Sequence, residues 1–134
     1  MRRILLTVVC ASVLAAGCGG NDEQPASVPA QPVLANLNVS VDPDGTGGEK
    51  ARTVAVKCTE PEDSKLCGAV ARLTAEDFAR TGGQMACTQQ FGGPEIATVT
   101  GTFRGETINA RFSRENGCEI SRWQKVAELL GAAG

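Results

Sequence analysis

The chain has six cysteines and no histidine, and these two facts limit the chemistry that its side chains can perform. Without histidine there is no base for Ser-His-Asp or Cys-His catalysis, no imidazole ligand for zinc and no histidine pH sensor. The carboxylates are scattered along the sequence, and no nucleophile is paired with a base. We therefore expect no enzyme activity, no metal site and no cofactor, and we look for a function that depends on binding.

Four of the cysteines lie in the part of the sequence with the pattern of a folded domain: Cys58, Cys67, Cys87 and Cys118. An even number of cysteines in an exported domain predicts disulfides, here two bridges. Their spacing fits neither a zinc ribbon nor a redox C-x-x-C pair. Four cysteines can pair in three ways. The local pairing of Cys58 with Cys67 would join a predicted strand to the helix beside it, and it would leave Cys87 with Cys118.

The first residues have the pattern of an export signal. The basic Met1-Arg2-Arg3 precedes an apolar run from Ile4 to Ala16, which is too short for a permanent membrane span. Small residues then lead to Cys18, and this pattern resembles the processing site of bacterial lipoproteins. Residues 1–17, with Cys10, are thus predicted to be removed, and Cys18 to be lipidated. An ordinary cleaved signal with an incidental cysteine is the alternative.

A lipidated Cys18 predicts a bacterial protein held on the extracytoplasmic side of the cell membrane, because several acyl chains on one terminus give stable anchoring. Residues 18–35 contain three prolines among small polar residues, the composition of a flexible tether. We expect the folded domain to span residues 36–134. The chain has a net charge of −2 and one tryptophan, and it has no Lys/Arg cluster, so a nucleic-acid partner is not expected.

Two strands are predicted at the start of this domain. Leu37, Val39 and Val41 alternate with polar residues, and residues 52–58 alternate in the same way, which is the period of a half-buried strand. Residues 42–48, DPDGTGG, connect the two strands. Two acids near a glycine resemble a calcium loop only in part, since the other ligands are missing, so a plain connection is favoured.

Helical patterns follow the second strand. Ser64 is a suitable N-cap for a helix in which Leu66, Val70 and Leu73 share one face. Residues 74–80 predict a further short helical turn that begins with a capping box of Thr74 and Asp77. Residues 123–130 also have helical spacing, although a strand beginning near residue 120 is the alternative.

The second half of the chain predicts a β-hairpin. Residues 96–104 and 107–113 flank Gly105-Glu106, a pair that suits a type II′ turn because glycine comes first. In that register Arg104 lies opposite Thr107, and apolar or small side chains share one face. Strands grouped in the sequence around one helical block indicate an α+β fold, with an antiparallel sheet covered by a helix.

Taken together, the motifs RTVAVKC, CTQQFGGP and GCEISR are similar to those of the bacterial subtilisin-inhibitor-like family of secreted serine-protease inhibitors. The resemblance spans residues 36–122 and includes four cysteines in order. It implies a sheet of about five antiparallel strands covered by one or two helices. It also implies the pairs Cys58–Cys67 and Cys87–Cys118, and homodimers that form through the sheet.

In that family, the inhibitory loop begins at the third cysteine, which here makes Cys87–Pro94 the inhibitory loop. The resemblance implies that Gln89 is the specificity residue, that Thr88 precedes it, and that Gln90 and Phe91 follow. The expected partner is a serine protease, subtilisin-like or trypsin-like, inhibited by substrate mimicry. Gln89 is neither basic nor large and apolar. A non-inhibitory lipoprotein that uses the same fold as a protein-binding module is therefore the alternative function.

Overall fold

A computed structural model describes residues 31–48 and 50–134, so the predicted signal, Cys18 and most of the predicted tether lie outside the described residues. The elements are β1 (Val33–Asp42), β2 (Arg52–Thr59), α1 (Lys65–Ala71), the 3₁₀ helix η1 (Ala75–Phe78), β3 (Ile96–Phe103), β4 (Glu106–Phe112), α2 (Gly117–Lys125) and α3 (Ala127–Leu130). The first strand begins at Val33, ahead of the Asn36 boundary inferred from the sequence, and Leu34 and Ala35 are buried.

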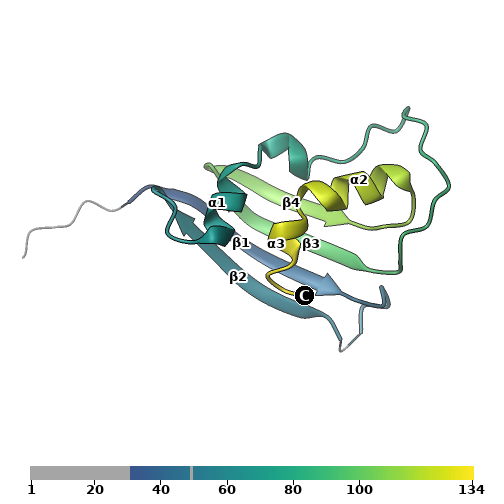
Figure 1. Cartoon of the computed structure of the whole chain (residues 1–134), viewed down its shortest axis with the longest axis horizontal. Helices are drawn as coiled ribbons and strands as arrows, with labels where there is room; N and C mark the ends of the chain where they lie inside the picture. The colour runs from purple at the N-terminus through teal and green to yellow at the C-terminus, as the bar shows by residue number, and fades with distance from the viewer. Residues whose placement is uncertain (1–30, 49) are drawn as a thin grey trace, which may run out of the picture.

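The fold is α+β, with one antiparallel sheet in the order β2-β1-β3-β4 (Figure 1). The prediction of an antiparallel sheet with helices on it is confirmed, but the sheet of the described residues has four strands instead of five. After β4 the chain enters α2, because the side chain of Asn116 caps that helix by accepting a hydrogen bond from the amide of Glu119 at 3.0 Å. The C-terminal segment is therefore helical and adds no strand.

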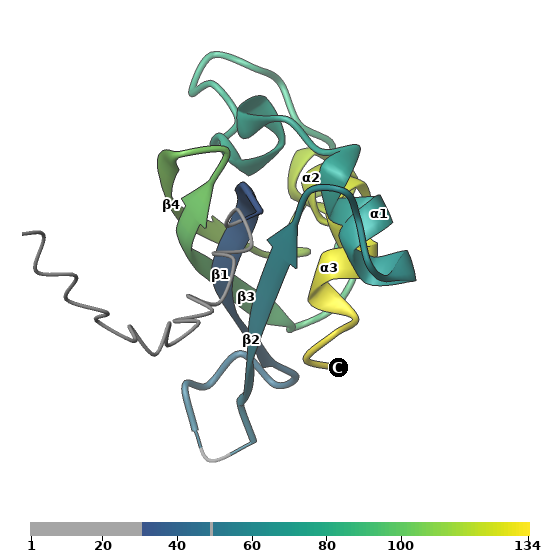
Figure 2. The ribbon, with the colours of Figure 1, turned by 90° about the vertical axis from the view of Figure 1, so that its left-hand side faces the viewer.

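The helices lie together on one side of the sheet (Figures 1 and 2). There are three short α-helices in the described residues, where one or two were expected, because the C-terminal helical segment is interrupted at Val126. The largest fully buried side chains come from both layers: Leu37, Val39, Val99, Phe103 and Phe112 from the sheet, and Val70, Val126 and Leu129 from the helical layer. Burial of this apolar surface between the layers is the main stabilising term of the fold.

The opposite face of the sheet carries short polar side chains. Thr98, Thr100 and Thr102 alternate along β3, beside Asn36 and Asn38 of β1, and all five are exposed. This face therefore has few apolar groups of the kind that form the centre of a stable protein interface. In the described part of the chain, no helix is long and apolar enough to cross a membrane.

The first two predicted helix starts are confirmed, whereas the C-terminal helix predicted from residue 123 already begins at Gly117. The hydroxyl of Ser64 accepts a hydrogen bond from the amide of Cys67 at 3.1 Å and so caps α1. The carboxylate of Asp77 accepts a hydrogen bond from the amide of Thr74 at 2.8 Å, which completes the capping box. This bond lowers the pKa of Asp77 below its ordinary value of 3.8. The turn that follows is a 3₁₀ helix and not an α-helix.

The β3–β4 hairpin exists, but its predicted turn is wrong. Phe103 pairs with Glu106, so the loop is Arg104-Gly105, with φ of 48° and 81°. Positive φ at both central residues is the pattern of a type I′ turn, whose twist matches that of the strands. Contacts from distant segments hold Arg104 in this uncommon conformation: its amide donates to the carbonyl of Leu34 at 2.8 Å, and its guanidinium donates to a carbonyl of α1 at 2.7 Å.

The change of turn moves the register of the hairpin by two residues, since Phe103 faces Glu106 and not Ile108. A shift by an even number leaves every side chain on its predicted face, because side chains alternate with a period of two. Phe103, Ile108 and Phe112 are accordingly buried. The predicted division of the hairpin into a core face and a polar face therefore holds although the predicted pairs do not.

Candidate functional site

A long irregular loop, residues 79–95, connects η1 to β3. Figure 1 shows it passing around the end of α2 at which that helix begins. It contains all the residues for which a binding role was predicted, from Cys87 to Pro94. Loops of this length usually carry function when they are ordered by contacts with a scaffold.

The first half of the loop is attached to the start of α2. The disulfide Cys87–Cys118 joins it to that helix, and Cys58–Cys67 joins β2 to α1, so both predicted pairings are confirmed. The carbonyl of Thr88 accepts a hydrogen bond from the amide of Gly117 at 3.1 Å. Gly117 lies directly against Thr88, because an added Cβ there would collide with the threonine hydroxyl in its present position.

The second half of the loop is attached to the connection between β4 and α2. The amide of Gly92 donates a hydrogen bond to the carbonyl of Arg114 at 2.7 Å. The guanidinium of Arg114 forms an ion pair with the carboxylate of Glu95 at 2.8 Å. The backbone at Gly92 also lies close to α2, since an added Cβ would be 2.9 Å from the side chain of Ile120.

Between these two attachments, Gln89, Gln90 and Phe91 are exposed to solvent, as is the preceding Thr88. Phe91 is 67% exposed, and Met85 earlier in the loop is 65% exposed. Only one other large hydrophobic residue of the described chain, Val33, is comparably exposed. The loop thus presents residues 89–91 with one exposed aromatic side chain, and the attachments on both sides of them rest on one short segment, residues 114–118. Aromatic side chains are enriched at protein–protein interfaces, so the exposed Phe91 favours a protein-binding role for the loop.

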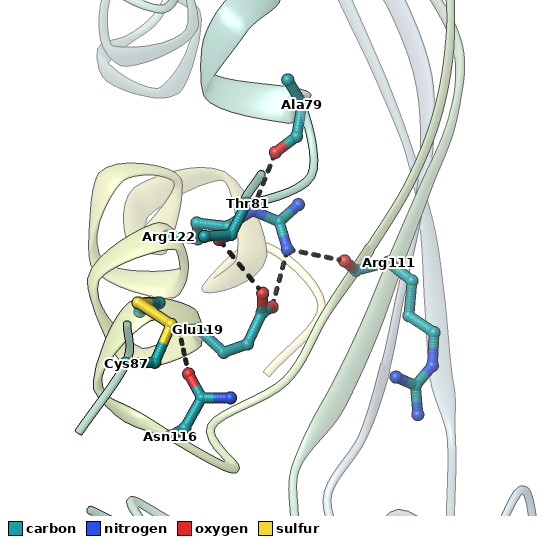
Figure 3. Close-up of polar contacts among 8 residues, drawn as sticks. Ala79, Thr81, Cys87, Arg111, Asn116, Glu119 and Arg122 are labelled. Atoms are coloured by element: carbon teal, nitrogen blue, oxygen red, sulfur yellow. Dashed lines mark hydrogen bonds and ion pairs between the residues drawn. A yellow bond between two sulfur atoms is a disulfide. The ribbon is translucent and has the colours of Figure 1, made fainter. Parts of the chain in front are cut away.

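A buried charged residue that the sequence interpretation did not identify supports the base of the loop (Figure 3). The guanidinium of Arg122 donates hydrogen bonds to the carbonyl of Ala79 at 2.8 Å, to that of Arg111 at 3.3 Å and to the carboxylate of Glu119 at 2.6 Å. It also lies over the ring of Phe112, 4.7 Å from the ring centre. Arg122 therefore joins the loop, the helix α2 and the strand β4 at one point.

The sequence contains only a weak indication of the hydrogen-bond network around Arg122. Glu119 and Arg122 are three residues apart in GCEISR, a spacing that is common on exposed helix faces. Here the pair is almost fully covered, with side-chain exposures of 17% and 10%. The second oxygen of Glu119 accepts a hydrogen bond from the hydroxyl of Thr81 at 3.4 Å, which adds a further link to the loop.

A groove of about 630 Å³ lies between the loop and α2, beside the disulfide that joins them. Its lining includes Thr88 and Gln90 of the loop, and Ser121 and Lys125 of the helix. In residues 31–48 and 50–134, no group of three or more acidic, cysteine or histidine side chains is placed so that it could hold a metal ion. The loop and the groove together present residues 88–91 at the surface beside α2.

We predict that Gly92→Ala displaces the presented segment, because the new Cβ would lie 2.9 Å from Ile120 and 3.3 Å from the Cβ of Arg114. The expected result is an exchange rate of the residue 92 amide hydrogen that rises by roughly tenfold, the factor that corresponds to about 1.4 kcal/mol. Amide exchange followed by NMR measures this. Shortening the neighbouring side chain, in Gly92→Ala with Ile120→Ala, should restore most of the protection. An unchanged exchange rate in the single variant would contradict the close packing.

Comparisons of the chain with protein-family models, with curated proteins and with solved structures found no match. The function is therefore inferred from the geometry of the loop.

Proposed function

We propose that this protein inhibits extracytoplasmic serine endopeptidases by substrate mimicry through the loop Cys87–Pro94. The observation that carries the proposal is the placement of residues 89–91. They are exposed, while Thr88 and Gly92 on either side are hydrogen-bonded to the same short segment of the scaffold. Anchoring through a lipidated Cys18 would place this loop at the outer surface of the membrane, where exported proteases act.

The proposed mechanism follows from the order of this loop. A protease binds its substrate as an extended strand, by backbone hydrogen bonds and side-chain pockets. A flexible substrate loses conformational entropy on binding, but a loop held at both ends has lost most of that entropy during folding. The two ends also stay in place if the bond is cut, so that the bond can form again. The loop would therefore bind tightly and be hydrolysed slowly.

In this proposal the Gln89 side chain enters the primary pocket of the protease and the Gln89–Gln90 bond lies across its catalytic serine. A carboxamide both donates and accepts hydrogen bonds. A pocket that leaves the amide unpaired would cost about 1–3 kcal/mol of binding free energy. We therefore expect the strongest binding to proteases whose primary pocket offers polar partners. Thr88 and Phe91 would contact the neighbouring subsites.

The second candidate is a non-inhibitory lipoprotein of the cell envelope that binds another protein through the same loop. The exposed Phe91 and Met85 favour it, since they could serve any protein partner. A homodimer through the uncovered face of the sheet stays a prediction, and sedimentation analysis of the purified domain tests it.

Titration of the purified domain against a panel of serine proteases tests the proposal. We expect stoichiometric inhibition of at least one enzyme, and we expect Gln89→Pro to abolish it. Proline fixes φ and restricts the residue before it, so the segment could not keep the conformation of a bound substrate. Gln89→Lys and Gln89→Met should inhibit trypsin-like and subtilisin-like enzymes respectively, because these side chains match their pockets.

The panel also distinguishes the two candidates. Inhibition by a substituted loop but not by the natural one would show that the scaffold inhibits and that Gln89 sets an unusual specificity. If neither the natural loop nor the Lys and Met variants inhibited any enzyme, the inhibitor proposal would be wrong and the binding module favoured.

A further inference from the structure

We propose that Arg114 and Glu95 form a clamp that holds the Gln90 end of the loop in place after the Gln89–Gln90 bond has been cut. The clamp deepens the proposed function and takes its biological purpose from it. Whether the clamp keeps the cut loop in place can nevertheless be measured independently of any inhibition of a protease. Arg114 and Glu95 are positioning residues here, because neither would touch the bond that is cut.

Arg114 reaches the loop at two points. Its carbonyl accepts the hydrogen bond from the amide of Gly92 at 2.7 Å. Its guanidinium pairs with the carboxylate of Glu95 at 2.8 Å, and the two side chains are only 33% and 29% exposed. A charge-assisted hydrogen bond in this partly covered position is stronger than a bond between neutral groups. One residue of the scaffold therefore spans the loop from Gly92 to Glu95.

The loop cannot supply this order by itself. Gly92 and Gly93 have no side chains, and glycine is the residue with the most backbone freedom to lose. Gly93 has a φ of 148°, and a Cβ there would collide with the carboxylate of Glu95. That carboxylate therefore lies directly against the glycine backbone, and its second oxygen is buried without a hydrogen-bond partner among the described residues. Contacts from Arg114 and Glu95 thus replace the stiffness that the two glycines lack.

The ordered position of residues 92–95 matters most once a protease has cut the loop, because it then keeps the new amine close to the cut end. When the protease serine attacks the carbonyl carbon of Gln89, the C–N bond to Gln90 breaks and an ester to the enzyme forms. The histidine of the protease passes the serine proton to the nitrogen of Gln90, which leaves as an amine. The reverse reaction needs that amine near the ester carbon. Gln90 is two residues from Gly92, so the clamp limits how far the amine can move.

The Gln89 side of the cut is held differently, by covalent and backbone links. Cys87 is bonded to Cys118, and the carbonyl of Thr88 accepts a hydrogen bond from Gly117. The disulfide also keeps the two pieces of a cut chain together, because Cys87 lies before the cut and Cys118 after it. The Gln90 side has no disulfide of its own between the cut and β3, so the noncovalent contacts of Arg114 and Glu95 decide whether the cut ends stay close together.

The test compares cut proteins. Limited digestion of Gln89→Lys with trypsin, with the cleavage site confirmed by mass spectrometry, yields two pieces joined by the disulfide. We expect the Gly92 amide of this cut protein to stay protected from hydrogen exchange. Adding Arg114→Ala or Glu95→Ala should speed its exchange by roughly tenfold or more, because the charge-assisted bond is lost. The exchanged pair, Arg114→Glu with Glu95→Arg, should recover most of the protection.

Two further measurements separate the clamp from a general effect on folding. Arg72→Ala removes an ion pair with Glu128 that is 70% and 62% exposed and outside the loop, and it should leave the Gly92 amide unchanged. The thermal midpoints of the uncut variants should lie close together. The clamp proposal would be wrong if the Gly92 amide exchanged equally fast in two cut proteins, Gln89→Lys alone and Gln89→Lys combined with Arg114→Ala. Protection at Gly92 without inhibition of trypsin would retain the clamp and count against the inhibitor proposal.

Discussion

Replacing both Cys87 and Cys118 with alanine is expected to lower the free energy of unfolding by about 3.7 kcal/mol. The bridge closes a loop with a sequence separation of 31 residues, and its loss increases the conformational entropy of the unfolded chain. Urea denaturation of the domain measures the loss. The proposed function further predicts that a protease cuts this variant as an ordinary substrate, because the disulfide no longer ties the Gln89 side of the loop to α2.

The other disulfide provides a matched control. Replacing Cys58 and Cys67 with alanine removes a bridge with a separation of 9 residues, and it should cost about 2.5 kcal/mol. This bridge joins β2 to α1, away from residues 87–95, so the loop should keep its order. Faster cleavage of the loop in the Cys58 and Cys67 variant than in the Cys87 and Cys118 variant would contradict the assignment.

Replacing Arg122 with alanine is expected to lower the free energy of unfolding by about 3–5 kcal/mol. The guanidinium is covered by the protein, and its removal would leave the largely covered carboxylate of Glu119, 17% exposed, without its cationic partner. It would also remove the donors to the carbonyls of Ala79 and Arg111. Denaturation in urea at neutral pH measures this effect, and amide exchange in residues 79–82 should rise with it.

Two comparisons test the cause of that loss. Arg72→Ala removes another arginine that donates to a carbonyl, but its side chain is 70% exposed, so the cost should stay below about 1 kcal/mol. Arg122→Met combined with Glu119→Leu should be more stable than Arg122→Ala, because no unpaired charge remains buried. A double variant that is less stable than the single one would show that the packing around Arg122, and not the charge of Glu119, causes the loss.

The position of Arg122 explains why its replacement should loosen the loop as well as lower the free energy of unfolding. Its hydrogen bonds tie Ala79, at the start of the loop, to α2 and β4. The disulfide ties the middle of the loop to the same helix. The scaffold therefore holds the loop at its start, on both sides of residues 89–91 and at Glu95. Such multiple attachment is what an inhibitor loop needs and what a freely mobile loop lacks.

Local patterns determined several parts of this structure in advance. The alternation of Leu37, Val39 and Val41 identified β1, and Ser64 marked the start of α1. Each of these signals depends on residues a few positions apart, and neighbouring residues are what a sequence pattern records. The two faces of the β3–β4 hairpin were predicted for the same reason. The pairing of the cysteines came from a family resemblance, and the structure has the same pairs.

The hairpin turn, the number of strands and the supports of the loop were decided only by the tertiary structure. Arg104 keeps a positive φ because Leu34 and α1 provide partners for it. Arg114 meets Glu95, and Arg122 meets Ala79, across separations of 19 and 43 residues. No pattern in the sequence records such contacts, since they exist only after the sheet and helices have packed. The sequence by itself determined which segment, CTQQFGGP, could be presented, and the packed fold decided how that segment is held.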